Sequence, residues 1–333
     1  MNILLTGGAG YIGSHTAVAL ASAGHAVVLY DNFVNSSRSV LGALETITGK
    51  PPVCIEDDVR DTARLTDTLR SHAIEAVIHF AGLKAVGESV EQPVAYYSAN
   101  VQGTISLLQA MQTVGLRSLV FSSSATVYGD PQYLPIDESH PTSATNPYGR
   151  SKLHIEEILA DCARADASWR IACLRYFNPV GAHASGLIGE NPNGIPNNLM
   201  PFVARVAAGR LPRLRVFGDD YATPDGTGVR DYIHVMDLAE GHLAALDFLS
   251  HTGGWHAINL GTGHGYSVLE MVRGFEAASG RAVPFDIAPR RAGDIAACYA
   301  SVDKATGLLH WQARRDLAAM CTSMWHHIAS GST

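Results

Sequence analysis

A tyrosine and a lysine four residues apart are the first feature of this sequence that could carry out chemistry. Tyr148 and Lys152 form a Tyr-x-x-x-Lys pattern, and residues at this spacing lie on one face of a helix. An ammonium group beside a phenol favours the phenolate, which predicts a lowered pKa for the tyrosine. The pair is therefore predicted to act as a general base near neutral pH. The alternative is an ordinary exposed helical pair.

A serine-rich stretch supplies a third polar group. Ser124 lies within Phe121–Gly129, which begins at the end of an apolar run. Open α/β sheets bind ligands at the carboxyl ends of their strands. We therefore expect Ser124 to form hydrogen bonds with both a substrate hydroxyl and the phenol of Tyr148. A serine-rich turn without function is the alternative.

Glycines at regular spacing follow the first apolar run. Gly7, Gly10 and Gly13 give a Gly-x-x-Gly-x-x-Gly pattern that leads into an amphipathic segment. A tight turn and a close approach of the backbone require residues without Cβ, and the helix N-terminus then offers N–H groups to a pyrophosphate. The pattern predicts a dinucleotide-binding loop, although a plain strand–helix turn is also compatible with it.

Two acidic residues indicate which dinucleotide the loop would bind. Asp31 ends the second apolar run, 18 residues beyond Gly13, which is close to the spacing of an acid that binds the adenosine ribose hydroxyls. A carboxylate there would repel a 2′-phosphate, so NAD is favoured over NADP. Asp58 follows the third run and is expected near the adenine, or else is a solvated loop acid.

Alternating strands and helices are expected to position these residues. The alternation predicts an α/β fold, a Rossmann-type doubly wound parallel sheet. Expected strands are Ile3–Leu5, Ala26–Tyr30, Val53–Ile55, Ala76–Phe80, Ser118–Phe121 and Ile171–Arg175, and expected helices are Ser14–Ala23, Thr62–Ser71, Pro93–Val114 and Tyr148–Ala163.

The pattern changes after Phe177, where glycine, proline and asparagine become frequent while Leu199–Ala208 and Leu214–Phe217 keep an apolar pattern. We expect an NAD-binding Rossmann domain over residues 1–177 and a second, smaller α/β substrate-binding domain over 178–333. A return of the segment around 231–248 to the first domain stays open.

Composition narrows the class of protein. The formal net charge of −7 argues against nucleic-acid binding, which needs a basic face. No apolar run reaches the length of a membrane span, and the N-terminus does not read as a signal peptide. Five cysteines without a Cys-x-x-Cys pair predict neither a disulfide framework nor zinc, so the cytoplasm is the expected location. No metal site is expected.

The chain resembles the extended short-chain dehydrogenase/reductase family, and within it the UDP-glucose 4-epimerases. The resemblance extends over nearly the whole chain, and its later stretches are specific to this branch. It rests on Gly7–His15, Asp31-Asn32, Val77–Val90, Phe121–Gly129, Tyr148–Lys152, Leu174–His183, Gly194–Pro201 and Asp225–Leu238.

The resemblance implies two sets of binding residues. The set for NAD is Gly7, Gly10, Tyr11, Ile12, Gly13, Asp31, Asn32, Asn35, Ser36, Asp58, Val59, Phe80, Ala81, Gly82, Lys84, Tyr148, Lys152 and Phe177. The set for a UDP-sugar is Lys84, Ser124, Tyr148, Asn178, Asn198, Leu199, Arg215, Val216, Phe217, Arg230, Arg291, Asp294 and Cys298.

One position departs from some relatives, because Ala99 stands where they carry an asparagine, with Asn100 next to it. We therefore expect no side-chain contact with the cofactor at position 99.

The implied reaction interconverts UDP-glucose and UDP-galactose by transient oxidation at sugar C4. Tyr148, helped by Ser124, takes the hydroxyl proton while a hydride passes to NAD. The keto sugar then turns over in its pocket. The hydride returns to the opposite face of the sugar, and Tyr148 returns the proton. Lys152 supports the phenolate by its charge.

The resemblance also bears on substrate width. A bulky tyrosine at the wall of the sugar pocket goes with narrow specificity, and Cys298 stands there instead, followed by Tyr299. We expect UDP-GlcNAc and UDP-GalNAc to be substrates as well. A buried structural cysteine, or a slip that puts Tyr299 at the wall, is the alternative.

Other functions stay open at this stage. A 4,6-dehydratase or a decarboxylase needs an acid beside the serine, and Ser124–Tyr128 contains none. An NADPH-dependent reductase is disfavoured by Asp31, and a non-catalytic NAD-sensing module would be expected to lack the complete Ser–Tyr–Lys set. The helices Pro93–Val114 and Tyr148–Ala163 resemble those that pair two subunits, so a homodimer is expected.

Overall fold

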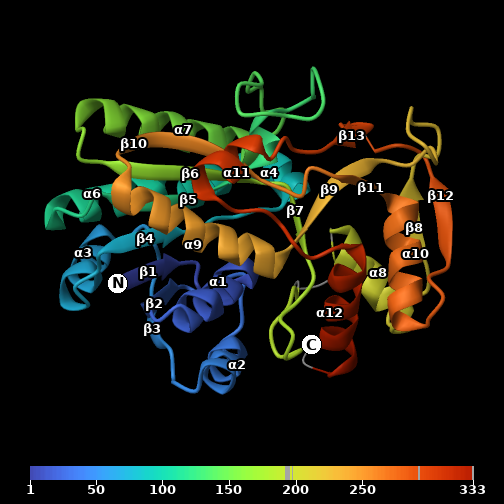
Figure 1. The fold of residues 1–333 in the computed structure, drawn as a ribbon, viewed down its shortest axis with the longest axis horizontal. Helices are drawn as coiled ribbons and strands as arrows, with labels where there is room; N and C mark the ends of the chain where they lie inside the picture. The colour runs from blue at the N-terminus through green and yellow to red at the C-terminus, as the bar shows by residue number, and fades with distance from the viewer. Residues whose placement is uncertain (192–195, 197, 292, 332–333) are drawn as a thin grey trace.

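A seven-stranded parallel sheet forms the centre of the larger part of the molecule (Figure 1). The computed structural model describes residues 1–191, 196, 198–291 and 293–331. The sheet has the order β10-β6-β5-β4-β1-β2-β3. Its strands are β1 (Asn2–Thr6), β2 (Ala26–Asp31), β3 (Val53–Glu56), β4 (Ala76–His79), β5 (Ser118–Ser124), β6 (Arg170–Tyr176) and β10 (Gly254–Leu260).

Helices cover both faces of this sheet, which is why its central strands are almost continuously apolar. One face packs against α1 (Tyr11–Ser22), α2 (Ser39–Thr48), α9 (Val235–His251) and α11 (Asp303–Leu309). The other packs against α3 (Thr62–Ser71), α6 (Gly103–Val114) and α7 (Pro147–Ala165), with α4 (Val86–Glu91) and α5 (Pro93–Tyr97) beside α7. The expected Rossmann-type α/β fold is thereby confirmed.

The expected elements are present with small shifts of their ends. The segment predicted as one helix over Pro93–Val114 is α5, a π-helical turn over Ser98–Gln102, and α6. Such turns occur frequently at functional sites, and this one contains the buried Asn100.

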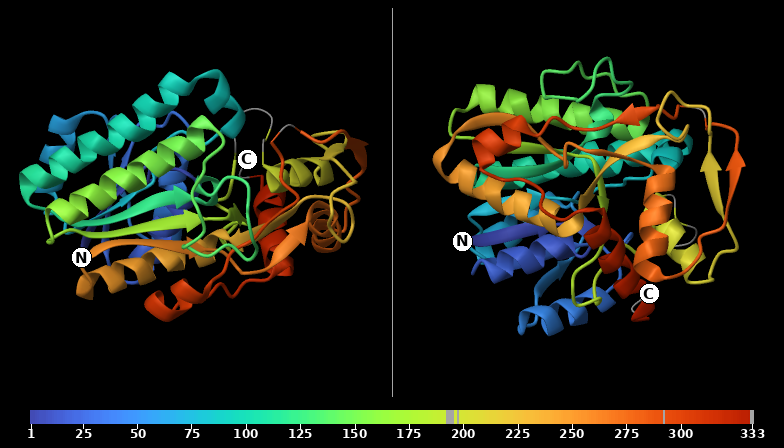
Figure 2. Two further views of the ribbon diagram at one scale, coloured as in Figure 1. Left: turned by 90° about the horizontal axis from the view of Figure 1, so that it is seen from above. Right: turned by 45° about the vertical axis from the view of Figure 1, so that its right-hand side comes forward.

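The smaller part of the molecule lies beside the carboxyl ends of the sheet (Figure 2). In one small sheet, the strand β9 (Val229–His234) pairs with β7 (Asn178–Val180), β11 (Gly265–Ser267) and β13 (Ala297–Cys298). The strands β8 (Leu214–Phe217) and β12 (Phe285–Ala288) form a second sheet. Helices α8 (Leu199–Ala207), α10 (Val268–Ser279) and α12 (Leu317–Ala329) form the core of this smaller part with these strands.

The chain crosses between the two parts more than once. After β9, helix α9 packs on α1, and β10 joins β6 at the edge of the large sheet. The division into residues 1–177 and 178–333 stays a prediction. Residues 194, 195 and 197 of the matched stretch Gly194–Pro201 lie outside the described residues.

None of the helices in the described part of the chain is long and apolar enough to cross a membrane.

Candidate active site

Ser124, Tyr148 and Lys152 come together where β5 ends and α7 begins. Ser124 is the last residue of β5, and its side chain caps the short η2 turn (Ala125–Val127) by accepting from the N–H of Thr126. Asn146 caps α7 in the same manner by accepting from the N–H of Gly149. The caps fix both chain directions, and the Ser124 hydroxyl lies close enough to the Tyr148 phenol to act on its pKa.

The Lys152 ammonium is buried beneath this pair. Its Nζ donates to the carbonyl oxygen of Ser122 at 2.7 Å and lies 4.9 Å from the centre of the Phe121 ring and 6.0 Å from that of Tyr148. Burial lowers the pKa of Lys152 to about 8, and the negative charge of Glu156 opposes this shift.

The pKa of Tyr148 corrects one expectation from the sequence. Burial raises the pKa of its phenol, and the hydrogen bond with Ser124 offsets this only partly. The expected lowering by Lys152 is absent because the ammonium group is bonded to the Ser122 carbonyl rather than to the phenol. The protein alone therefore holds Tyr148 as a neutral phenol.

Asn100 is a residue of this site that sequence reasoning missed. Its side-chain amide donates to the Ser151 hydroxyl at 2.9 Å and to the carbonyl of Leu83 at 3.1 Å, and it accepts from the N–H of Leu83 at 2.7 Å. It thus ties the π-helical turn to α7 and to the loop after β4. Its place next to Ala99 was the available signal.

The glycine loop leaves the space that a dinucleotide needs. Gly7 has φ +68°, and a Cβ there would lie 2.7 Å from the backbone nitrogen of Ala81. A Cβ on Gly13 would lie 2.4 Å from the carbonyl oxygen of Gly7. Helix α1 begins after Gly10 without a side-chain cap, so its first N–H groups are left for an anion. These features fit NAD.

Asp31 is buried at the end of β2 and accepts several hydrogen bonds. Its carboxylate receives the N–H of Ala9 at 2.9 Å, the N–H of Phe33 at 2.8 Å and the hydroxyl of Ser36 at 3.0 Å. It therefore fixes the glycine loop relative to the loop after β2.

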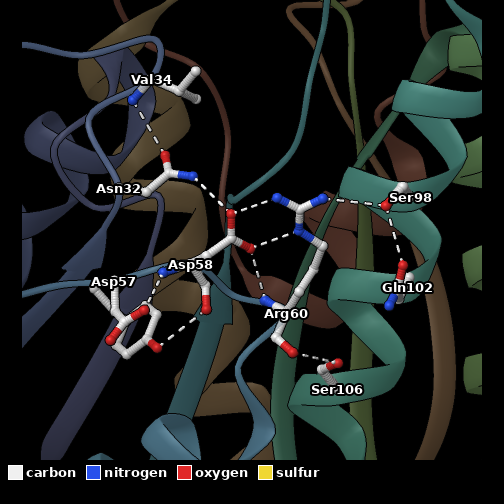
Figure 3. A network of polar contacts seen from close by, with 9 residues as sticks. Asn32, Val34, Asp57, Asp58, Arg60, Ser98, Gln102 and Ser106 are labelled. Atoms are coloured by element: carbon white, nitrogen blue, oxygen red, sulfur yellow. Dashed lines mark hydrogen bonds and ion pairs between the residues drawn. The ribbon is translucent and has the colours of Figure 1, made fainter.

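Asp58 lies at the centre of a polar network beside Asn32 (Figure 3). Its carboxylate accepts from the Arg60 guanidinium at 2.8 and 2.7 Å and from the Asn32 amide at 3.2 Å. Hydrogen bonds with Arg60 lower the pKa of Asp58 to about 2. Arg60 also reaches Ser98, so the network connects the second and third strands to the π-helical turn.

A buried carboxylate links the two predicted binding sets. Oε1 of Glu190 accepts from the Lys84 ammonium at 3.1 Å and from the Asn198 amide at 2.7 Å. No local pattern indicates a role for Glu190, because its partner Lys84 is 106 positions away.

Two arginines of the predicted substrate set flank one aromatic ring. The guanidinium carbons of Arg215 and Arg291 lie 5.3 and 4.6 Å from the ring centre of Phe217. Asp294 accepts from Nε of Arg291 at 2.9 Å. The side chain of Val216 is buried in the core of the smaller part instead.

Cys298 lies against the active-site side of the molecule. It pairs with Arg230 in the register of β13 and β9, and it packs on a cluster that contains Val127 and the buried Phe177. Tyr299 contacts Gly265 instead. Burial raises the pKa of the Cys298 thiol to about 11.

The remaining predicted residues fall into three groups. Phe80 and Ile12 pack against the core, with the Phe80 ring 4.9 Å from that of His242, and Val59 is buried. The loop after β4 contains Ala81 and Gly82, and a Cβ on Gly82 would lie 2.9 Å from the Asn100 side chain. The rest are placed as follows: Tyr11 donates to the carbonyl of Gly181 at 2.6 Å, Asn35 and Asn178 are exposed, and Leu199 begins α8.

In the described residues, no group of three or more histidine, cysteine, aspartate or glutamate side chains could hold a metal ion. The fold, the glycine loop and the Ser–Tyr–Lys set together define an NAD-dependent enzyme of the extended short-chain dehydrogenase/reductase type.

Comparison with known proteins narrows this class. The family model described as GDP-mannose 4,6 dehydratase matches residues 4–324. The UDP-glucose 4-epimerase of Bacillus subtilis (strain 168) is 57% identical over 325 residues, which make up 98% of this chain and 96% of that protein.

Two solved structures are similar along the whole chain. The UDP-glucose-4-epimerase from Stenotrophomonas maltophila with bound NAD and formylated UDP-arabinopyranose has a TM-score of 0.98 and 53% identity, covering 100% of this chain and 99% of that one. The UDP-glucose 4-epimerase from Bifidobacterium longum in complex with NAD+ and UDP has a TM-score of 0.95 and 52% identity, covering 99% and 98%.

The chain therefore belongs to the UDP-glucose 4-epimerases of the extended short-chain dehydrogenase/reductase family. It is an NAD-dependent isomerase.

Proposed function

We propose that Ser124, Tyr148 and Lys152 carry out the proton transfers of UDP-glucose 4-epimerisation in this chain. Tyr148 removes the proton of the sugar 4-hydroxyl and later returns it, Ser124 bonds the same hydroxyl and orients the phenol, and Lys152 supplies the positive charge. The observation that carries the proposal is the position of Tyr148 over the buried Lys152 ammonium, whose Nζ lies 6.0 Å from the ring centre of Tyr148 and donates to the carbonyl of Ser122, two residues before Ser124.

NAD, when bound, would supply the hydride acceptor and donor for sugar C4, so the net reaction would be redox-neutral. The residues of the first predicted set would hold it: the glycines of the loop and the N-terminus of α1 at the pyrophosphate, and Asp31 and Asp58 at the adenosine. The nicotinamide half would lie by Phe80, Lys84 and Phe177. The positive charge of the nicotinamide ring would favour the Tyr148 phenolate. The protein alone does not favour it, because burial raises the pKa of the phenol.

The UDP half of the substrate is proposed to bind along the smaller part of the molecule. Arg230 and Arg291 carry the charge and fork geometry that suit a diphosphate. Asn178, Asn198 and Asp294 suit the ribose and uracil. The two guanidinium groups of Arg215 and Arg291 beside the Phe217 ring support an anionic ligand at this edge.

The dehydratase and decarboxylase alternatives are not favoured. Both need a carboxylic acid next to the serine, and Ala125, Thr126 and Val127 occupy the turn that follows Ser124. The curated relatives of this chain are epimerases. A non-catalytic NAD-sensing role would leave the Ser–Tyr–Lys arrangement without purpose.

Replacement of the phenol tests the proposed chemistry. Tyr148→Phe and Ser124→Ala should lower kcat by about 10²- to 10⁴-fold, because each removes part of the proton transfer. Bound NAD should stay at the wild-type content, since neither change touches the glycine loop. Tyr97→Phe, on α5, serves as the matched control. A Tyr148→Phe variant with wild-type kcat would contradict the proposal.

Cys298 is proposed to widen the sugar pocket enough for an N-acetyl group. The cluster that it shares with Phe177 supports its place at the wall, while Tyr299 packs on Gly265. In Cys298→Tyr we expect turnover of UDP-GlcNAc to fall strongly while UDP-glucose turnover is kept. Unchanged selectivity would end the idea, and Cys298→Ala should behave as the wild type.

The assembly and location are proposed as a homodimer in the cytoplasm. The exposed apolar side chains of Val94 on α5 and Ile105 on α6 support a subunit interface along the predicted helix Pro93–Val114, and five free thiols are in keeping with a reducing compartment.

A further inference from the structure

A buried ion pair lies one helical turn beyond the catalytic lysine. Nη2 of Arg175, on β6, is 2.6 Å from Oε2 of Glu156, and Nε is 3.0 Å from Oε1. Their side chains are only 5% and 2% exposed. Glu156 Oε1 also accepts from the hydroxyl of Ser123 at 2.5 Å. The pair therefore bonds directly to the residue that precedes Ser124.

The ion pair is part of a longer chain of buried hydrogen bonds. Nη1 of Arg175 donates to the phenol oxygen of Tyr128 at 3.0 Å, and that phenol donates to the Asn259 side chain at 2.7 Å. Because Arg175 neutralises Glu156, the ammonium of Lys152 is left with the neutral carbonyl of Ser122 as its hydrogen-bond acceptor. A buried cation without a paired anion is costly.

Several other titratable groups lie around Lys152 and Tyr148, and they are neutral at neutral pH. His79 on β4 is held between Thr6 and Thr104, and burial lowers its pKa to about 3, so it is neutral. Burial raises the pKa of Tyr176 on β6, of Tyr96 on α5 and of Tyr148 on α7. These phenols are neutral too.

The charges that matter are therefore Lys152, Arg175 and Glu156. Glu156 supplies the negative charge that acts on Lys152, from four positions along α7, and the three groups together carry one net positive charge. A phenolate at Tyr148 would bring this total to zero.

We propose that Glu156 and Arg175 are positioning residues that set the charge beneath the catalytic pair. Glu156 keeps Lys152 protonated through space, and Arg175 holds that carboxylate so that it does not form a direct ion pair with the lysine. The ammonium is thereby reserved for Tyr148. This inference rests on the proposed roles of Tyr148 and Lys152.

The pH dependence of kcat is expected to follow the net charge of Lys152, Arg175 and Glu156. Glu156→Gln leaves two cations, so Lys152 should lose its proton at a lower pH and the alkaline limb of kcat should move down by about one pH unit. Glu156→Gln/Arg175→Gln restores one net charge, so the limb should return to its wild-type position. Glu157→Gln, on the exposed face of the same turn, should leave the profile unchanged.

The experiment is the pH dependence of kcat for UDP-glucose with the purified holoenzyme and these variants, after circular dichroism has established folding. If Glu156→Gln lowers kcat at every pH while the limb stays in place, the pair is structural and the proposal is wrong. If Glu156→Gln does not fold, Arg175→Gln gives the opposite test. Arg175→Gln removes a cation and leaves Glu156 unpaired, so the alkaline limb of kcat should move to higher pH. An alkaline limb that does not move would again contradict the proposal.

The two proposals can fail separately. Wild-type kcat in Tyr148→Phe would contradict the proposed function. A strong loss in Tyr148→Phe together with unmoved limbs in the Glu156 and Arg175 variants would contradict this inference alone.

Discussion

At the scale of single residues, burial controls the chemistry of this site. Removal from water raises the pKa of Tyr148 and lowers that of Lys152 to about 8, because both shifts favour the neutral forms. Lys152 can therefore lose its proton close to neutral pH, whereas Tyr148 needs an additional positive charge, such as that of the cofactor ring, to become a phenolate.

The lowered pKa of Lys152 has a direct consequence for the pH dependence. The ammonium is charged below about pH 8 and is lost above it, so kcat should fall as the pH rises through that value, well below the pKa of an ordinary lysine. Lys152→Arg should be slower but should lack this alkaline limb, because a guanidinium stays charged. A wild-type profile that remains flat beyond pH 10 would contradict the role of Lys152.

At the scale of elements, local sequence patterns were sufficient to predict those functional features that are formed by residues close together in the sequence. The glycine spacing predicted the turn at Gly7 and Gly13, and the Tyr-x-x-x-Lys spacing predicted one helix face. Contacts between residues far apart in the sequence were not indicated: Ala99 pointed to Asn100 but not to its partner Ser151, and nothing pointed to the contact of Glu190 with Lys84. These residues are polar groups whose meaning comes only from tertiary packing, so a single sequence does not reveal them.

The close contact at Gly13 gives a prediction for the loop as an element. Gly13→Ala would place a Cβ about 2.4 Å from the Gly7 carbonyl oxygen, so the loop must open. We expect purified Gly13→Ala to contain little NAD. Gly42→Ala on α2 is the control, because nothing lies within 4 Å of its added Cβ. The NAD content released on heating measures both, and wild-type content in Gly13→Ala would refute the assignment of the loop.

At the scale of the whole molecule, the chain order itself was the hardest feature to predict. Strand β10 lies at the edge of the large sheet beside β6, although its first residue, Gly254, is 78 positions along the chain from Tyr176, the last residue of β6. Nothing in the short run Gly254–Leu260 indicates which sheet it joins. The Rossmann-type sheet was predictable because its first six strands follow each other with a regular alternation of helices.

Subunit pairing is the prediction that belongs to this scale. Val94 and Ile105 are 79% and 39% exposed on α5 and α6, which favours their burial against a second copy. Val94→Glu should place two like charges across the twofold axis and give a monomer mass in solution scattering. Leu308→Glu, an exposed apolar position on α11, should keep the dimer. A monomeric wild-type protein would exclude this interface.

The central claim is that hydrogen leaves sugar C4 and returns to it within one closed site. The most direct test uses UDP-glucose with deuterium at C4, purified protein and no added coenzyme, followed by mass and proton spectra of the product. The account predicts UDP-galactose that keeps the deuterium at C4 in water. Loss of the label to solvent, or a steady requirement for added coenzyme, would contradict it.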